Sequence, residues 1–306
     1  MAIVSAEKFV QAARDNGYAV GGFNTNNLEW TQAILRAAEA KKAPVLIQTS
    51  MGAAKYMGGY KVCKLLIENL VESMGITVPV AIHLDHGHYE DALECIRVGY
   101  TSVMFDGSHL PVEENLEKAR KVVEFAHANG VSVEAEVGTI GGEEDGIIGD
   151  GELAPIEDAK AMVATGIDFL AAGIGNIHGP YPANWKGLHL DHLQKLTEAV
   201  PGFPIVLHGA SSVLPEFVAK CNEFGGNIPG AQGVPEEMLR KAAQMAVCKI
   251  NIDTDLRLAM TASVCEYLAQ NPSEFDPRKY LGPARDAIKG MVAHKIKNVL
   301  GSSNKL

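Results

Sequence analysis

The chain has 306 residues, of which 47% are hydrophobic and 21% charged, a composition typical of a soluble globular protein. Its formal net charge of −10 argues against nucleic acid or an anionic membrane as the main partner, since both favour basic surfaces. The length is large for one ordinary domain but normal for a single α/β barrel.

The five cysteines form an odd set without any Cys-x-x-Cys spacing. We therefore expect unpaired cysteines in a reduced, cytoplasmic compartment. The start of the chain has no basic segment followed by an apolar core, so we expect no signal peptide. No apolar run approaches the length that spans a membrane.

Short apolar runs alternate with longer amphipathic runs from end to end. The apolar runs predict strands near Ala19–Phe23, Val45–Gln48, Val80–Leu84, Ser102–Phe105, Ser132–Val137, Asp168–Ala172, Pro204–Leu207 and Cys248–Ile252. The amphipathic runs predict helices near Leu28–Ala40, Tyr60–Met74, Glu90–Val98, Val112–Asn129, Pro155–Ala164, Asp191–Ala199, Leu214–Phe224 and Glu236–Ala246.

This alternation predicts a (β/α)8 TIM barrel, in a single domain over residues 1–306 with extra C-terminal helices over about 254–306. A doubly wound sheet is the rival architecture, but it would leave the late strands without a place. The glycine-rich segment Gly138–Gly151 is expected to be a mobile loop that closes over a site. The alternative for this segment is an ordinary solvated surface loop.

Polar residues follow every predicted strand, at the end where such barrels place their chemistry. Three histidines, His86, His178 and His208, each precede a glycine near the end of an apolar run. Each alone could be a satisfied core histidine. Together they suggest three neutral imidazoles with an open fourth position, which is the usual arrangement of catalytic zinc. The other polar strand ends are Asn24, Ser50, Asp85, Asp106, Glu134, Glu136, Asn251 and Asp253.

Small and hydroxyl residues follow the last two strands, in His208–Ser212 and Asn251–Thr254. Barrels commonly bind phosphate in these two loops through backbone N–H groups, although serine and threonine also cap helices there. Lys249 shares a strand face with Asn251 and could form a Schiff base with a ketone. The alternative role of Lys249 is a structural charge paired with the acids. His83 is expected to be a packed barrel histidine.

Many segments of the chain match one known family. The sequence resembles class II, metal-dependent fructose-1,6-bisphosphate aldolases over nearly its full length. The matching segments are Gly22–Thr25, Gln48–Ser50, His83–Gly87, Thr101–Asp106, Val133–Gly138, His178–Gly179, Leu207–Ser211, Lys249–Asp255 and Asp276–Tyr280. No single segment would suffice, but together they are highly specific.

The resemblance implies reversible cleavage of fructose 1,6-bisphosphate to dihydroxyacetone phosphate and glyceraldehyde 3-phosphate through a zinc-stabilised enediolate. Tagatose 1,6-bisphosphate is an alternative substrate for the same mechanism, and a zinc hydrolase on the same barrel is a further alternative that would not need two phosphate sites. The resemblance also implies a homodimer or homotetramer.

The resemblance implies a role for each matching site residue. Zinc falls on His86, His178 and His208, with a second or alternative divalent position at Asp106 and Glu136. Asp85 becomes the base at the hydroxyl beside the bond that is cut, and the loop acids Glu143 and Glu144 the groups that transfer the proton at carbon. A monovalent cation, Na+ or K+, falls at backbone carbonyls around Gly179 and Gly209. The implied substrate contacts are Asn24, Ser50, Gly179, Gly209, Ala210, Ser211, Asn251, Ile252, Asp253, Thr254, Arg257 and Arg278. The resemblance leaves open which of the two arginines reaches the far phosphate from a neighbouring subunit.

The sequence departs from one common version of the family pattern. Many relatives carry a lysine shortly after the stretch that corresponds to His178–Tyr181. Here Tyr181 is followed by Pro182, and the next lysine is Lys186.

Overall fold

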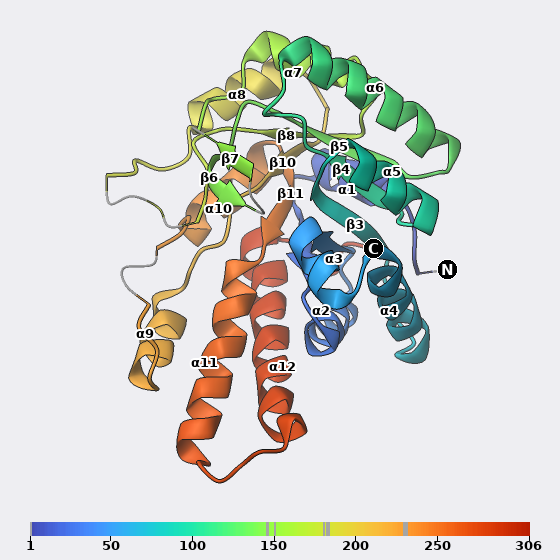
Figure 1. Cartoon of the computed structure of the whole chain (residues 1–306). Helices are drawn as coiled ribbons and strands as arrows, with labels where there is room; N and C mark the ends of the chain where they lie inside the picture. Colours follow the sequence, from blue (N-terminus) through green and yellow to red (C-terminus); the bar gives the residue numbers. More distant parts are fainter. Residues whose placement is uncertain (1, 145–146, 150, 180, 182–183, 229–231) are drawn as a thin grey trace.

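The structure is a computed structural model that describes residues 2–144, 147–149, 151–179, 181, 184–228 and 232–306, without the side chains of 143, 144 and 147–149 (Figure 1). Its centre is a closed barrel of parallel strands in the order β1-β11-β10-β8-β5-β4-β3-β2. These strands are Val20–Asn24 (β1), Val45–Ser50 (β2), Val80–Gly87 (β3), Ser102–Phe105 (β4), Ser132–Val137 (β5), Phe169–Ala172 (β8), Ile205–Leu207 (β10) and Val247–Ile252 (β11). The predicted TIM barrel is confirmed.

The barrel interior changes from apolar to polar along the strands. Val20, Leu46, Phe169 and Val206 belong to one buried cluster, and helix α1 (Glu7–Asn16) adds its apolar residues to the same cluster. Because every second residue of a strand faces inward, the next inward positions after this layer are polar. These positions include Gln48, His83, Glu134 and Lys249, all of them fully buried. The carboxyl ends of the strands therefore open into a polar cavity.

Helices cover the outside of the barrel between successive strands (Figure 1). Those expected from the sequence are present as α2 (Leu28–Lys41), α4 (Tyr60–Ser73), α5 (Tyr89–Val98), α6 (Val112–Ala128), α7 (Ile156–Val163), α8 (Leu190–Ala199), α9 (Pro215–Glu223) and α10 (Glu236–Met245). Two helices were not predicted, α1 and the seven-residue α3 (Met51–Met57). Ser50 begins α3, since its hydroxyl accepts a hydrogen bond from the backbone N–H of Ala53 at 3.2 Å.

The C-terminal part is helical, as the sequence indicates. Helices α11 (Thr254–Gln270) and α12 (Pro277–His294) run side by side below the barrel in Figure 1. A π-helix, η1 (Lys295–Leu300), then returns the chain to the barrel, where Leu300 O accepts a hydrogen bond from Ala19 N at 3.0 Å. The single-domain assignment over residues 1–306 stays a prediction. None of the helices in the described ranges combines the length and the apolar composition needed to cross a bilayer.

The glycine-rich segment contains two short strands in addition to loop. It contains β6 (Gly141–Glu144) and β7 (Ile147–Gly149), which form a three-stranded sheet with β9 (Ile177–His178) in the order β7-β6-β9. The cause is long-range pairing, because β6 finds its partner β9 more than thirty residues later. The local sequence is rich in glycine and acidic residues and does not predict strands. His178 therefore belongs to this small sheet and not to the end of barrel strand β8.

Candidate active site

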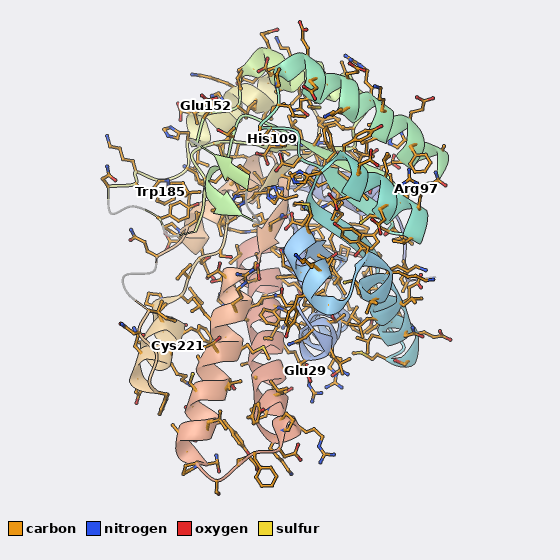
Figure 2. All side chains as sticks on the ribbon, in the orientation of Figure 1. Glu29, Arg97, His109, Glu152, Trp185 and Cys221 are labelled. Atoms are coloured by element: carbon orange, nitrogen blue, oxygen red, sulfur yellow. The ribbon has the colours of Figure 1, made fainter. Side chains whose placement is uncertain are left out.

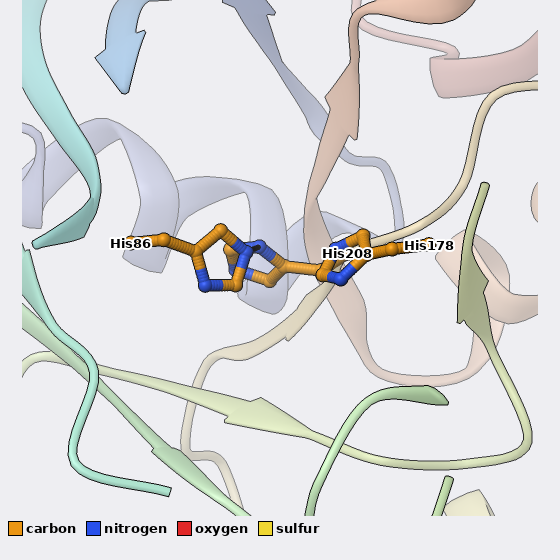
Figure 3. A group of neighbouring side chains, drawn as sticks. All are labelled: His86, His178 and His208. Atoms are coloured by element: carbon orange, nitrogen blue, oxygen red, sulfur yellow. Dashed lines mark hydrogen bonds between the residues drawn. The ribbon is translucent and has the colours of Figure 1, made fainter. Parts of the chain in front are cut away.

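Three imidazoles meet at the mouth of the barrel (Figure 3). His86 comes from β3, His178 from β9, and His208 directly follows β10. One ring nitrogen from each of these residues lies within 4.8 Å of the corresponding nitrogens of the other two. His86 and His208 are 3% and 1% exposed. The backbone of His86 has φ of +48°, a conformation that is uncommon for residues other than glycine and that turns this residue at the end of its strand.

Two carboxylates fix the orientation of two of these rings. His86 Nδ1 lies 2.7 Å from Asp106 Oδ2, and His208 Nε2 lies 2.6 Å from Glu134 Oε1. A carboxylate only accepts hydrogen bonds, so these two ring nitrogens carry the protons. Burial lowers the pKa of His208 and keeps its imidazole neutral. His208 therefore presents a lone pair on Nδ1, and His86 in its neutral form presents one on Nε2.

These lone pairs point at one another, because His86 Nε2 and His208 Nδ1 are 2.8 Å apart. Two facing lone pairs repel unless a cation or a proton lies between them. The donor set of three imidazoles also matches the ligands that a divalent ion of the zinc type prefers. The residues present thus fit a bound divalent metal.

A second group of possible ligands adjoins the first. His86, Asp106 and Glu136 also bring their ligand atoms within 4.8 Å of one another. Glu136 Oε2 is buried and has no hydrogen-bond partner among the described residues. Burial, and then the neighbouring charge of Asp106, raise the pKa of Glu136 well above its usual value. A cation would relieve both problems, so these residues also fit a divalent ion.

Behind His208 lies a buried ion pair. Lys249 Nζ contacts Glu134 Oε2 at 2.8 Å and Asn251 Oδ1 at 2.8 Å, and both ionic side chains are completely buried. Burial alone would raise the pKa of Glu134, but Lys249 and His208 outweigh it and hold that pKa well below its usual range. Lys249 is not among the described residues that line the cavity. This favours the structural role of Lys249 over the Schiff base. His83 is packed as expected, with Nδ1 2.8 Å from Ser102 Oγ.

Asp85 stands beside the imidazoles, held by two amides. Its Oδ2 accepts from Asn24 Nδ2 at 2.8 Å, its Oδ1 accepts from Asn251 Nδ2 at 2.9 Å, and Oδ1 lies 3.7 Å from His208 Nδ1. Gln48 in turn donates to Asn24 Oδ1 at 3.0 Å, which fixes the direction of that amide. Asp85 is 2% exposed and lines the cavity. A carboxylate oriented in this way can accept a proton from a group in the cavity.

A cavity of about 380 Å³ opens above these residues. Most of the expected substrate contacts line it, namely Asn24, Gly179, Gly209, Ala210, Ser211, Asn251, Asp253, Thr254 and Arg257. Arg257 pairs with Asp253 one helical turn before it. Ser211 Oγ accepts from Asp253 N at 3.3 Å, so the loops after β10 and β11 meet on one side of the cavity.

Several expected residues lie elsewhere. The side chain of Ile252 is buried in the hydrophobic core, so only its backbone is free to face a ligand. Ser50 caps α3 and lies beside Asp85 in the register of the neighbouring strands β2 and β3. The side chain of Arg278 is 88% exposed at the start of α12 and pairs with Asp276. The side chains of Glu143 and Glu144 lie outside the described residues, as does Pro182.

Other residues of the site were not expected from the sequence. Tyr181 donates its hydroxyl to Gly209 O at 2.8 Å and accepts from Ile177 N at 2.9 Å. Asn176 donates to His208 O at 2.9 Å. Trp185, labelled in Figure 2, packs against Tyr181 with ring centroids 4.4 Å apart. These residues tie β9 to the end of β10. Asn176 lies in the glycine-rich stretch Gly173–Gly179, whereas no sequence pattern marked Tyr181 or Trp185 as site residues.

A barrel with three metal-competent imidazoles, an adjacent oriented carboxylate and two small-residue loops defines a metal-dependent barrel enzyme that accepts a phosphorylated ligand. Comparison with known proteins gives the family. The family model described as "Fructose-bisphosphate aldolase class-II" matches residues 4–305. Fructose-bisphosphate aldolases from Streptococcus pyogenes serotype M1 and Streptococcus pneumoniae serotype 4 are each 69% identical to this chain over all of both sequences.

Solved structures agree with the sequence comparison. The crystal structure of the YdjI aldolase from Escherichia coli K12 superposes with a TM-score of 0.78 at 26% identity, covering 99% of each chain. The chain belongs to the class II fructose-bisphosphate aldolase family. It is therefore a lyase of a metal-dependent class that acts on a phosphorylated sugar, and the hydrolase alternative is set aside.

Proposed function

We propose that the protein catalyses the reversible aldol cleavage of fructose 1,6-bisphosphate to dihydroxyacetone phosphate and glyceraldehyde 3-phosphate, with zinc at His86, His178 and His208. The family match supports the reaction, and its near relatives carry the name of this substrate. The observation that carries the proposal is the placement of Asp85 beside the three imidazoles, in a cavity bordered by two loops suited to phosphate.

Cleavage of the bond between C3 and C4 leaves an electron pair on C3. The three imidazoles would hold a divalent ion, which would supply Lewis acidity for the negative charge that develops on the ketone half. Glu134 and Asp106 hold two of the imidazoles in one orientation and fix which ring nitrogen carries the proton. The orientation exists before substrate arrives, since both contacts are buried.

Asp85 accepts the proton of the C4 hydroxyl. As that O–H bond breaks, a C4=O bond forms and the C3–C4 electron pair passes to the ketone half. Asn24 and Asn251 hold the carboxylate in place for this transfer. In the direction of synthesis Asp85 returns the proton to the new C4 oxygen. Glu144 is proposed to protonate C3 of the ketone half from the segment above the site.

The two phosphates have separate binding sites. Gly179, the segment Gly209–Ser211 and the segment Asn251–Thr254 are proposed to bind the dihydroxyacetone phosphate half through backbone N–H groups and hydroxyls. Ser50 and Arg257 are proposed to bind the glyceraldehyde 3-phosphate half. We also propose that Arg278 serves the active site of a neighbouring subunit, because it lies at the start of α12 with its side chain 88% exposed and does not line the cavity.

Further ions and an assembly belong to the proposal. Asp106 and Glu136 would hold a second or alternative divalent position with His86. Backbone carbonyls near Gly179 and Gly209 would hold Na+ or K+. A homodimer or homotetramer would supply the neighbouring Arg278. We place the protein in the cytoplasm, in keeping with its five free cysteines.

The experiment is cleavage of fructose 1,6-bisphosphate coupled to detection of triose phosphate, before and after treatment with a chelator and after zinc is added back. We expect the chelator to abolish activity and zinc to restore it. Tagatose 1,6-bisphosphate is assayed in parallel, and the ratio of the two rates identifies the substrate. Zinc-loaded protein that cleaves neither sugar would refute the proposed function.

Borohydride provides the mechanistic control. A Schiff base at Lys249 would be trapped as a covalent adduct with loss of activity. We expect no adduct, because Lys249 Nζ is already engaged by Glu134 and Asn251 below the cavity. Chelator-resistant activity accompanied by an adduct would show that the reaction proceeds through a Schiff base at Lys249 rather than through a metal.

A further inference from the structure

A second buried lysine connects the C-terminus of the chain to the active-site rim. Lys295, the first residue of η1, is completely buried. Its Nζ lies 2.9 Å from Asp255 Oδ2, 2.7 Å from Glu236 Oε1 and 2.9 Å from Ser212 Oγ. A buried ammonium group costs free energy unless it is paired, so these contacts hold Lys295 in one place. No step of the proposed mechanism uses this cluster.

Asp255 transmits the position of Lys295 to the loop after β10. It lies in the first turn of α11 and is 1% exposed. Its carboxylate accepts hydrogen bonds from the backbone N–H groups of Ser212 at 2.9 Å and Val213 at 2.7 Å. Lys295 thus completes the coordination of a buried carboxylate that would otherwise carry an uncompensated charge. The loop is bound at two successive peptide groups.

The loop needs this restraint, because part of it is strained. Val213 has φ of +51°, a left-handed conformation that β-branched residues avoid. Packing supports the same conformation from the other side. A Cβ atom at Gly233 would collide with Ser211 O and with Ser212. Such strained residues persist only where several contacts determine them.

The loop after β10 has two parts, a first part that lines the cavity and a second part whose N–H groups bind Asp255. The N–H groups of Ser212 and Val213 turn away from the cavity toward Asp255. The three preceding residues, Gly209, Ala210 and Ser211, line the cavity, and within the described part of the chain no acceptor is found for their N–H groups. These N–H groups are therefore available to an anion, in a direction set by the next two residues.

We propose that Lys295, through Asp255, is a positioning residue that orients the Gly209–Ser211 N–H groups toward the phosphate of the dihydroxyacetone phosphate half. Lys295 itself does not touch substrate. This inference rests on the proposed function. Its specific content is that a residue at the end of the chain controls the affinity for one half of the substrate and not for the other.

The test is the Lys295→Met variant of the zinc-loaded enzyme, assayed in the direction of synthesis. We expect KM for dihydroxyacetone phosphate to rise roughly tenfold, the effect of losing about one charge-assisted hydrogen bond. KM for glyceraldehyde 3-phosphate and the zinc content should stay as in the wild type. A merely destabilised protein would lose active enzyme and kcat without changing the ratio of the two KM values.

Three further variants sharpen the comparison. Asp255→Asn should give the same split and serves as the test if Lys295→Met does not fold. The double variant should be no worse than either single variant, because both act through one contact. Lys220→Met is the control, since it removes an ion pair of 2.9 Å with Glu266 between α9 and α11 without touching the loop. It should leave both KM values unchanged.

Calorimetric titration with dihydroxyacetone phosphate separates the two ways of failing. The proposed function fails if the wild-type enzyme shows no turnover. The inference fails if Lys295→Met and Asp255→Asn bind dihydroxyacetone phosphate as tightly as the wild type. It also fails if affinity for both halves of the substrate falls equally.

Discussion

At the residue scale, hydrogen bonds from buried neighbours fix the orientation of the side chains that form the site. The imidazoles of His86 and His208 are turned by Asp106 and Glu134, and the carboxylate of Asp85 by two amides. The sequence indicated the histidines and Asp85, because ionisable residues at the end of an apolar run are unusual. It did not indicate which acid faces which ring, since that depends on how the strands are staggered in the closed barrel.

The first prediction separates proton transfer from metal binding. Asp85→Ala should keep its zinc, because the three imidazoles are unchanged, and should lose about 10²–10⁴-fold in kcat, the usual contribution of a positioned base. His208→Ala should lose zinc and activity together. Metal analysis and steady-state kinetics on both variants provide the measurement. Normal turnover by Asp85→Ala would mean that another group takes the proton.

The second prediction concerns the carboxylate behind His208. Glu134→Gln removes the charge that pairs with Lys249 and the acceptor that fixes the His208 ring. We expect zinc affinity to fall about 10–100-fold, as for other groups that orient metal ligands. Competition with a chelator measures it. The double variant Glu134→Gln with Lys249→Met should bind zinc better than Glu134→Gln alone, because it no longer buries an unpaired ammonium group. Unchanged affinity in Glu134→Gln would contradict this role.

At the element scale, the barrel was predictable and the small sheet was not. Each barrel strand is a short apolar run between turn residues, and such runs identify buried parallel strands without any long-range information. Strands β6, β7 and β9 lack that pattern, and their pairing depends on partners distant in sequence. The same limitation hid α1, whose role in closing the apolar end of the barrel is visible only once the barrel exists.

The third prediction tests whether the small sheet positions a metal ligand. Gly142 in β6 has φ of +90°, and a Cβ atom there would collide with the carbonyl oxygen of His178. Gly142→Ala should therefore displace β9 and weaken zinc binding about tenfold, corresponding to strain of about 1–3 kcal/mol.

Gly290 in α12 offers the matched control for that substitution. A Cβ atom at Gly290 would meet nothing within 4 Å, and alanine is the better helix former by about 1 kcal/mol. Gly290→Ala should leave zinc affinity as it is and stabilise the protein slightly. If the two alanine variants bind zinc equally well, the small sheet does not position His178.

At the scale of the whole molecule, the buried polar side chains inside the barrel that serve catalysis also lower the stability of the metal-free protein. Asp106 and Glu136 share one buried region with His86, and no charge from the described residues compensates Glu136 directly. A separate cluster of buried polar contacts around Lys295 connects the C-terminal π-helix to the loop at the rim of the same cavity. The rim of the active site therefore depends on contacts from the last helix of the chain. A bound divalent ion should compensate the negative charge of Asp106 and Glu136.

The last prediction follows from the raised pKa of Glu136. An acid whose pKa is raised in the folded state stabilises the protein at low pH, and this contribution is lost as pH rises from its unfolded value of about 4.3 through the folded value. Metal-free wild-type protein should therefore be destabilised at neutral pH, because the folded protein must either hold a proton on Glu136 that the unfolded chain would release or bury an uncompensated charge. Glu136→Gln keeps the size of the side chain and removes the charge. We expect metal-free Glu136→Gln to be more stable than metal-free wild type, by roughly 1–3 kcal/mol.

The sign of the pH dependence makes this prediction specific. Asp106, whose pKa is depressed despite burial because His86 and Ser108 bond its carboxylate, loses its stabilising effect only as pH falls. The advantage of Glu136→Gln should thus grow between about pH 5 and pH 8 and shrink when a divalent ion is added. Thermal unfolding of both proteins across this range, with and without zinc, measures it. If the two metal-free proteins unfold at the same temperature at every pH, the pKa of Glu136 is not raised in the folded protein and its carboxyl is not poised for a cation.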